Sequence, residues 1–556
     1  MTNKDLADLI FPNITKDIEY YEKKYPKRES VEGAIVTRYA PSPTGFIHIG
    51  ALLASFTESV FARQTNGTFY LRIEDTDTKR TVDNGIQLII DGLKEFGVTF
   101  DEGPLLNGES KGMYGPYIQS ERKEIYQAFA KYLLEQGLAY PCFCSSEEME
   151  KIRGQQAKLK ERIGYYGKWA KCRNLTIEEA YNKIKNGEQY IIRFKSNGNY
   201  NDIEYCKDEI RGTIEFPQND LDIVIIKSDG LPTYHFAHVV DDHLMRTTHI
   251  IRGNEWLSSM PIHVQLFKAF GFKPPKYAHI SPLCKIDEET GTIRKVSKRK
   301  DPEFAMSYYH EQGIPYESVM LYLANITDST FENWQRANPD KEIKDFKFSF
   351  KRIPKSGALF DVDKLMNISK NFISRLTAQE LYDRVADYLK EYNPNFYVVF
   401  TANPDYSTRV LNIEREKKKP RKDIAKYSDV YIELSYMYDE CYTPQYDDSN
   451  YDTDMYMNYL CSFYDDNDDK DVWFNKIKTV ACQYGYGTTK EYKENPELFV
   501  GSVGDFCEGL RYIITNRRQT PDLYEICNIL GKDRLIERLK NYTYVMEQNN
   551  GKKKIR

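Results

Sequence analysis

The tripeptide His48-Ile49-Gly50 has the residue types of a phosphate-binding site. It follows a turn rich in Pro and Gly at residues 40–45 and precedes apolar residues at helical spacing, which places it at the start of a helix. Backbone N–H groups and the positive helix end attract anions there, and a glycine at position 50 would let a nucleotide come close. The ring N–H of His48 can stabilise charge that grows on a phosphoryl oxygen. Alone, a histidine in so short a motif is more often a capping or surface residue.

A second segment, Lys295-Val296-Ser297-Lys298-Arg299, lies in a basic stretch between Gly291 and Pro302. Most such stretches are solvated loops. Two lysines that flank a serine on a mobile loop can also close over ATP phosphates and neutralise departing pyrophosphate. Both segments in one chain, in this order, favour nucleotide chemistry.

Strand and helix patterns indicate the scaffold that must position these segments. Apolar runs at residues 34–39, 69–73, 221–226 and 249–252 are typical of buried strands, and residues 52–61 repeat apolar side chains at helical spacing. Strands that alternate with helices predict a parallel α/β sheet with helices on its faces.

The rest of the chain predicts a different organisation. Residues 115–220 carry helical stretches rich in Lys and Arg, as expected of an insertion into the sheet domain. Strand signals fade beyond residue 300, and Thr377-Ala-Gln-Glu380 is a capping box before an amphipathic helix, so the C-terminal third is expected to be all-α. Residues 1–31 are expected to form a polar helical extension. The acidic stretch 445–471 is expected to be an exposed loop or a solvated helix face.

Length and composition limit the class of protein. A chain of 556 residues fits three to five modules, and 41% hydrophobic with 29% charged residues is typical of folded domains. The net charge of −5 means that a nucleic-acid partner must be met on local basic patches. Ten scattered cysteines suit a reducing cytoplasm, and we expect neither a secretory signal nor a membrane span.

Several segments together resemble one enzyme family. Arg38-Tyr-Ala-Pro-Ser-Pro-Thr-Gly-Phe-Ile-His-Ile-Gly50 is similar to the HIGH signature of class I glutamyl- and glutaminyl-tRNA synthetases, and Lys295-Val-Ser-Lys-Arg299 resembles the KMSKS loop of class I synthetases. Leu71-Arg-Ile-Glu-Asp-Thr-Asp77 is similar to the strand that follows the first signature in the glutamate branch. Residues 233–245 and 251–257 resemble the amino-acid pocket of glutamyl-tRNA synthetases.

The resemblance, closest to the bacterial-type glutamyl-tRNA synthetases, implies an architecture. It is an α/β fold in which a Rossmann-type parallel-sheet catalytic domain carries an inserted acceptor-binding domain and is followed by an all-α anticodon-binding region. The implied segments are an N-terminal extension (1–31), the first half of the catalytic domain (32–114), the inserted tRNA acceptor-binding domain (115–220), the second half with the KMSKS-like loop (221–300), a stem-contact region (301–370) and an α-helical anticodon-binding domain (371–556).

The resemblance also implies roles for individual residues. The implied catalytic residues are His48, Gly50, Lys295 and Lys298; the implied glutamate-binding residues are Arg38, Ala40, Ser42, Glu74, Tyr234 and Arg252; and the implied ATP-binding residues are His48, Gly50, Glu255, Trp256, Lys295, Ser297 and Lys298. Arg38 and Arg252 would hold the carboxylates of glutamate, because a planar guanidinium binds a carboxylate through two hydrogen bonds. Glu74 would receive the ammonium group. The chain departs from some relatives at His238, where they place an asparagine that touches the substrate.

The implied activity is that of a glutamate–tRNA ligase. ATP, with Mg²⁺, would activate L-glutamate to glutamyl-adenylate, and the glutamate would pass to the 3′-terminal adenosine of tRNA(Glu). The family implies a cytoplasmic monomer, and charging of tRNA(Gln) stays open. Three alternatives are a glutaminyl-tRNA ligase, which usually has a P-N-G-type first signature and a C-terminal β-barrel; a non-catalytic tRNA-binding paralogue; and a smaller nucleotidyltransferase. Both intact signatures and the helical C-terminal third favour the glutamate ligase.

Three cysteines resemble a zinc motif that some family members carry in the inserted domain. Cys142-Phe-Cys144 and Cys172 supply three ligands, whereas a structural zinc site needs four. Tyr165, Tyr166 or a more distant residue would have to complete the set. Three reduced cysteines without a metal are an equally good interpretation.

Two C-terminal segments resemble the tRNA-binding region of the family. Residues 415–422 (REKKKPRK) form a basic block, and residues 501–531 resemble part of the anticodon-binding helices. Basic blocks are often only solvated, but a tRNA ligase needs cations for phosphates. The basic block is therefore a candidate tRNA surface.

Overall fold

The computed structural model describes residues 1–29, 31–43, 47–77, 82, 84–105, 107–446 and 451–553. The chain divides into two compact units: Met1–Tyr308 with Met320–Asp361, and Tyr309–Val319 with Val362–Arg556. Residues 44–46 of the first signature and 447–450 of the acidic stretch lie outside the described residues.

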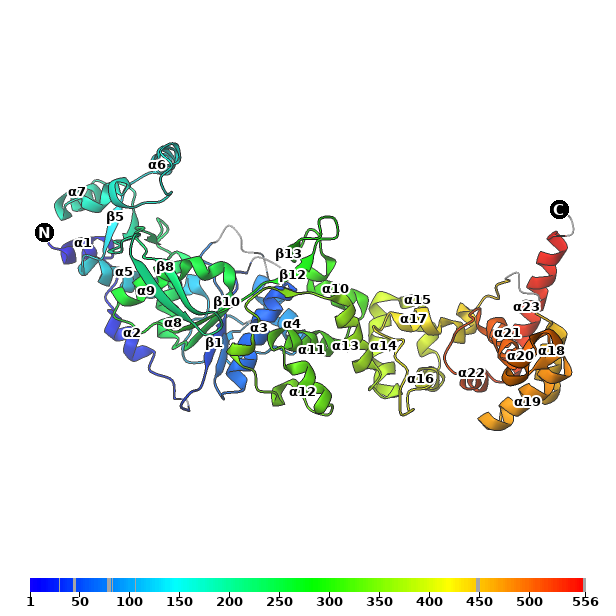
Figure 1. Ribbon diagram of the computed structural model, residues 1–556. Helices are drawn as coiled ribbons and strands as arrows, with labels where there is room; N and C mark the ends of the chain where they lie inside the picture. Colours follow the sequence, from blue (N-terminus) through cyan, green and yellow to red (C-terminus); the bar gives the residue numbers. More distant parts are fainter. Residues whose placement is uncertain are drawn as a thin grey trace. The chain divides into compact units, whose positions relative to one another are not determined.

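A parallel sheet forms the centre of the first unit (Figure 1). Strand β1 (Val36–Tyr39) pairs with β2 (Thr68–Leu71), and β10 (His249–Gly253) pairs with β11 (Lys276–Ile280), all in parallel. The Thr248 amide donates to the Val36 carbonyl (3.0 Å), which joins the two pairs at the starts of β10 and β1. Helix α3 (Ile49–Arg63) packs against both β1 and β10. The predicted parallel α/β sheet is therefore confirmed.

The run at residues 221–226 was expected in this sheet, and that expectation is wrong. It forms β9 (Val224–Ile226), which pairs antiparallel with β6 (Ile191–Phe194) in a separate three-stranded sheet with β5 (Ala139–Cys142). Instead, β7 (Ile203–Asp208) reaches the parallel sheet, where Asp208 aligns with Tyr277 of β11. A short apolar run does not show which sheet will bury it, because either offers the same apolar environment.

The N-terminal residues fold onto the catalytic unit. Helices α1 (Asn3–Ile10) and α2 (Ile18–Lys24) both contact α5 (Lys123–Glu135). Buried Ala7 and Tyr21 share one hydrophobic cluster with that helix. The predicted helices are present, but their apolar faces make the segment part of a core.

The remaining elements of the first unit complete its layers. They are α4 (Gly85–Glu95), β3 (Gly103–Pro104), β4 (Ser110–Lys111), α6 (Ser146–Lys158), α7 (Ile177–Lys185), β8 (Gly212–Pro217), α8 (Tyr234–Leu244), α9 (Met260–Ala269), β12 (Leu283–Ile286), β13 (Ile293–Lys295), α12 (Phe331–Ala337) and β14 (Ala358–Leu359). Helices α10 (Met306–Gln312) and α11 (Tyr316–Thr327) cross the boundary between the units.

The second unit is helical, as predicted, apart from two-residue strands β15 (Tyr486–Gly487) and β16 (Gly501–Ser502). The predicted capping box opens α14 (Ala378–Tyr392), where Leu381, Val385 and Leu389 are fully buried. The other helices are α13 (Val362–Ile373), α15 (Pro394–Thr401), α16 (Pro404–Asn412), α17 (Asp429–Leu434), α18 (Thr453–Asn458), α19 (Lys470–Gln483), α20 (Thr489–Glu494), α21 (Val503–Thr515), α22 (Leu523–Leu530) and α23 (Lys532–Lys553).

The acidic stretch is not the solvated segment that its charge predicts. Tyr456, Tyr459 and Leu460 are at most 1% exposed and belong to the core of the helical unit. The aspartates that the structure describes in this stretch stay near the surface, where Asp452 and Asp469 cap the starts of α18 and α19. The aromatic residues between the aspartates carry the packing, which a reading of charge alone overlooks.

Two expectations about the class of protein can be compared with the structure. All ten cysteines lie among the described residues, and each is a free thiol. Across the described ranges, no helix combines the length and the apolar character that crossing a bilayer requires.

Candidate functional site

His48 is the N-cap of α3, and its ring has a defined orientation. Its Nδ1 accepts a hydrogen bond from the Ala51 amide (3.0 Å), and the ring stacks on Phe304 with centroids 4.5 Å apart. Because Nδ1 accepts, the neutral ring carries its hydrogen on Nε2. Burial, and then the charge of Lys295, lower the pKa of His48, so the ring is neutral at pH 7. His48 can therefore donate from Nε2 to an anionic ligand.

Gly50 also makes room for the capping histidine ring. A Cβ at this position would lie 3.1 Å from Nδ1 of His48, which is tighter than ordinary contact. The expected access for a nucleotide at Gly50 stays a prediction.

A cavity of about 180 Å³ connects the two signatures. Its lining includes His48, Gly50, Glu255, Lys295 and Phe304. The structure therefore brings together segments that are about 245 residues apart in sequence, which only a tertiary fold can do. Ser297, Lys298 and Trp256 do not line this cavity in the described structure.

The basic loop is held by carboxylates on either side of it. Arg294 donates to both oxygens of Asp301 (2.6 and 2.8 Å) and to Asp287 (2.7 Å), and the Ser297 amide donates to Asp301 (2.8 Å). Lys300 also reaches Asp287 (3.2 Å). In the described part of the chain, no carboxylate forms an ion pair with exposed Lys298.

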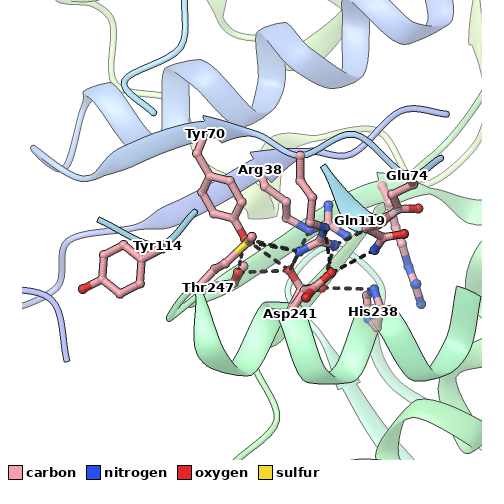
Figure 2. Close-up of polar contacts among 12 residues, drawn as sticks. Arg38, Tyr70, Glu74, Tyr114, Gln119, His238, Asp241 and Thr247 are labelled. Carbon is pink, nitrogen blue, oxygen red and sulfur yellow. Dashed lines mark hydrogen bonds and ion pairs between the residues drawn. The ribbon is translucent and has the colours of Figure 1, made fainter. Parts of the chain in front are cut away.

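A network of buried charges lies at the carboxyl ends of β1 and β2 (Figure 2). Arg72 donates to Asp242 (2.9 Å) and to Glu74 (3.1 Å), and Arg38 donates to Asp242 (3.1 Å). Arg72 and Asp242 are at most 1% exposed. Asp242 comes from α8, so the helix and the strands are joined by these ion pairs.

Burial and charge act in opposite directions on these carboxyl groups. Burial raises the pKa of Asp242, but the charges of Arg38 and Arg72 outweigh it and lower that pKa to about 2. Burial raises the pKa of Glu74 despite Arg72 and Arg38, and it raises the pKa of Glu58 far above the usual range. Asp242 is therefore a fixed negative charge that the two arginines share.

Arg252 at the end of β10 has a different environment. Its Nε donates to His279 (3.0 Å), one terminal nitrogen donates to the Tyr234 hydroxyl (3.1 Å), and the other donates to the Trp256 carbonyl (3.2 Å). His263 lies 3.5 Å from the guanidinium. Arg252 is 6% exposed, and no carboxylate of the described residues forms an ion pair with it. A buried cation with only neutral partners is a candidate site for an anion.

Two other expected site residues, Tyr234 and Trp256, lie beside Arg252. Tyr234 opens α8 and packs on the ring of Trp256, with centroids 4.5 Å apart. Ala40 and Ser42 follow β1, next to Pro41, whose carbonyl accepts from the Glu74 amide (2.9 Å). His238 is buried with Nδ1 3.0 Å from Asp242 and Nε2 3.2 Å from the Tyr277 hydroxyl, which ties it to the network.

Several residues of this region were not singled out from the sequence. Arg72 and Asp242 stand within apolar runs, where a charged residue is itself a signal of a buried pair. His263 and His279 carried no local signal, because their relation to Arg252 exists only after folding. Half of the eight histidines of the chain lie in this region: His279 and His263 contact Arg252, and His235 and His238 contact His263.

The three cysteines converge. The sulfur of Cys144 lies 3.7 Å from that of Cys172, and the three ligand atoms, including that of Cys142, lie within 4.8 Å of one another. The Tyr165 hydroxyl lies 3.2 Å from Cys144 and 3.4 Å from Cys142, whereas Tyr166 donates to a backbone carbonyl elsewhere. Sulfurs bound to one tetrahedral zinc at about 2.3 Å stand about 3.8 Å apart, so this cluster fits zinc.

The basic block at residues 415–422 is less free than its sequence suggests. Arg415 donates to the carbonyls of Ile373, Leu376 and Leu411, and Lys417 pairs with Glu414. Arg415 and Lys417 therefore bond to other groups of the protein, whereas Lys418 and Lys419 are exposed. Only part of the block is therefore a candidate tRNA surface.

Comparison with known proteins adds independent findings. Residues 34–367 match the model for the catalytic domain of tRNA synthetases class I (E and Q), and residues 380–543 match an anticodon binding domain. The chain is 47% identical over 555 residues to a glutamate–tRNA ligase of Clostridium perfringens (strain SM101 / Type A), covering 98% of this chain and 100% of that one. It is 46% identical over 547 residues to a glutamate–tRNA ligase of Acetivibrio thermocellus, covering 97% and 100%.

A solved structure has the same fold. It is a glutamate tRNA ligase from Elizabethkingia meningosepticum in complex with its amino acid, with a TM-score of 0.74 at 26% identity. The match covers 91% of this chain and 99% of that one.

Proposed function

Because the chain belongs to the family of class I tRNA synthetases for glutamate and glutamine, we propose that it acts as a glutamate–tRNA ligase. It activates L-glutamate with ATP and transfers it to the 3′-terminal adenosine of tRNA(Glu). The full-length likeness to glutamate–tRNA ligases and the helical second unit favour glutamate over glutamine as the substrate.

The observation that carries the proposal is the buried guanidinium of Arg252, which has no carboxylate partner among the residues that the structure describes. A substrate carboxylate would neutralise it and accept its remaining hydrogens. Arg38 is the second candidate cation because of its resemblance to a residue of the family's glutamate site, although Asp242 already pairs with it. The raised pKa of Glu74 reflects its burial beside the same network. Once the ammonium group of glutamate is next to Glu74, that carboxyl would ionise and bind it.

The adjoining cavity supplies the site for ATP. The glutamate α-carboxylate attacks the α-phosphorus, the bond to the β-phosphate breaks, and pyrophosphate leaves. His48 donates from Nε2 to a phosphoryl oxygen, while Lys295 and Lys298 neutralise the departing charge. Mg²⁺ would accompany the phosphates. A ribose hydroxyl of the tRNA then attacks the activated carbonyl and releases AMP.

Charging assays test this function. Labelled glutamate and glutamine are offered with tRNA(Glu) and with tRNA(Gln), and we expect glutamate on tRNA(Glu). Glutamine as the preferred amino acid, or the absence of any charged tRNA, would overturn the proposal. The assay with tRNA(Gln) and labelled glutamate shows whether the enzyme also forms Glu-tRNA(Gln). We infer that the enzyme works as a cytoplasmic monomer.

His48 can be tested without removing its helix cap. His48→Asn keeps a side chain that accepts from the Ala51 amide but removes the ring Nε2–H. We expect adenylate formation to slow about 100-fold. Pyrophosphate exchange in the presence of tRNA measures this rate. An unchanged rate would contradict the assigned role.

We also propose that Cys142, Cys144, Cys172 and Tyr165 hold a structural zinc ion. The support is the 3.7 Å separation of two sulfurs and the position of the phenol beside the third. Metal analysis should give one zinc per chain, with Cys144→Ser losing it and Cys206→Ser, which changes a buried thiol outside the cluster, keeping it. The proposal would be overturned if wild-type protein, expressed in zinc-supplemented medium and then purified, contained no metal.

A further inference from the structure

Two buried residues stand in line behind the guanidinium of Arg252: His279 accepts from its Nε, and Asp208 lies beside the other ring nitrogen of His279. We propose that His279 and Asp208 are positioning residues, which direct the fork of Arg252 toward the substrate carboxylate without neutralising its charge. This inference rests on the proposed role of Arg252 in binding glutamate.

His279 must present a lone pair to Arg252. Arg252 Nε donates to His279 Nε2 over 3.0 Å, and an arginine has no acceptor to offer in return. The ring hydrogen of neutral His279 must therefore stand on Nδ1, 2.7 Å from a carboxylate oxygen of Asp208. Burial lowers the pKa of His279, which keeps the ring neutral at pH 7.

Asp208 is itself fixed in place. One of its oxygens accepts from the amides of Ile210 (2.9 Å) and Arg211 (2.8 Å), and the other accepts from the His279 amide (3.0 Å) as well as from its ring. Asp208 is 2% exposed and His279 is fully buried. A carboxylate with backbone donors on both oxygens cannot rotate or exchange its partners for water.

His279 and Asp208 fix the orientation of the Arg252 guanidinium without neutralising its charge. Asp208 is joined to Arg252 through an imidazole ring, so its own charge pairs with the ring N–H rather than with the guanidinium. Tyr234 and the Trp256 carbonyl fix the two terminal nitrogens. Arg252 therefore has a defined plane and keeps its positive charge available for a substrate anion.

Replacing Asp208 with Asn should reverse the His279 tautomer. The amide oxygen of Asn can keep the bonds from Ile210 and Arg211, which leaves its NH₂ group facing both the backbone amide and Nδ1 of His279. The backbone amide cannot change its role, whereas the ring can change its tautomer. Nδ1 must then accept, the ring hydrogen moves to Nε2, and it meets the N–H of Arg252 donor to donor. The Arg252 guanidinium then loses the His279 acceptor that sets its orientation.

The test is steady-state aminoacylation by the full chain. Asp208→Asn should raise the KM for glutamate about tenfold, with the KM for ATP unchanged and kcat within about threefold. The matched control is Asp222→Asn: Asp222 is 1% exposed and accepts from the Ser196 amide and the Tyr140 hydroxyl, away from Arg252. It should leave both KM values unchanged.

His279→Leu keeps the inference testable if Asp208→Asn fails to fold, because it removes the acceptor of Arg252 Nε and leaves Asp208 unchanged. It should raise the KM for glutamate about tenfold with the KM for ATP unchanged, and a KM for glutamate within twofold of wild type would overturn the inference.

Where Asp208→Asn folds, a further substitution tests whether the two residues act through one another. His279→Gln offers Arg252 an amide oxygen that needs no carboxylate to orient it. In this background Asp208→Asn should add less than a twofold change in the KM for glutamate. The same tenfold increase with and without His279 would overturn the inference, because the two residues would act independently.

Failure of the inference differs from failure of the proposed function. Wild-type protein that charges tRNA with glutamate, together with a KM for glutamate in Asp208→Asn that stays within twofold of wild type, overturns the positioning role alone. Wild-type protein that charges no glutamate overturns the function on which the inference rests.

Discussion

Two buried arginines in the catalytic unit have opposite surroundings. Arg72 has carboxylates of Asp242 and Glu74 within 3.1 Å, whereas Arg252 donates to a histidine, a phenol and a carbonyl. A guanidinium compensated by carboxylates stabilises the fold, and one surrounded by neutral acceptors is available for a ligand. The partners of a cation, more than its presence, indicate its role.

The basic loop repeats this comparison in an exposed setting. Arg294 and Lys300 have Asp287 and Asp301 as partners, but within the described residues Lys298 has no carboxylate partner. The paired cations hold the loop, and the unpaired one can meet phosphates. Four experiments follow.

The largest expected effect is on stability. Arg72→Met leaves Asp242 and Glu74 without their shared cation in the interior, and we expect it to lower the free energy of unfolding by about 3–5 kcal/mol. Urea unfolding measures the change. Arg252→Met is the control. It should lower the free energy of unfolding by less than about 1.5 kcal/mol, because it leaves no buried carboxylate without a cation. Equal costs would remove the distinction between the two arginines.

The reverse order is expected for substrate binding. Arg252→Gln should raise the KM for glutamate about 100-fold, which corresponds to about 2.7 kcal/mol, while the KM for ATP stays near its wild-type value. Aminoacylation kinetics with each substrate varied in turn give both constants. A parallel rise in the KM for ATP would show a general disturbance of the site.

A smaller effect separates two lysines of the basic loop. Lys298→Ala should slow adenylate formation about 30-fold, because it removes a cation that meets the pyrophosphate. Lys300→Ala should slow it less than threefold, because its pair with Asp287 is exposed and weak. Pyrophosphate exchange compares the two; equal losses would contradict their separate roles.

The last experiment concerns a charge that appears only at low pH, on His249, a buried histidine at the start of β10 that does not contact Arg252. Burial, and then the charge of Lys276, lower its pKa to about 4. Between pH 6.5 and 4 the unfolded chain binds a proton that the folded chain does not, so stability falls as the pH falls, by about 1.4 kcal/mol per unit. His249→Gln should lose this component. A difference between wild type and variant that is constant from pH 6.5 to 4.5 would refute it.

The sequence by itself determined the local features. His48 as a helix N-cap, the capping box at Thr377, and the order of the two signatures follow from residue types and spacing. These features depend on neighbours within a few positions, which the sequence displays directly.

Only the tertiary structure decided which residues meet. It assigned β9 to an antiparallel sheet, buried the tyrosines of the acidic stretch, and brought four histidines into the region of Arg252. It also distinguished Arg72 from Arg252, because their partners come from segments up to about 170 residues away along the chain. Ionic compensation depends on distances of a few ångströms in space, and the spacing of charges along a sequence does not reveal them.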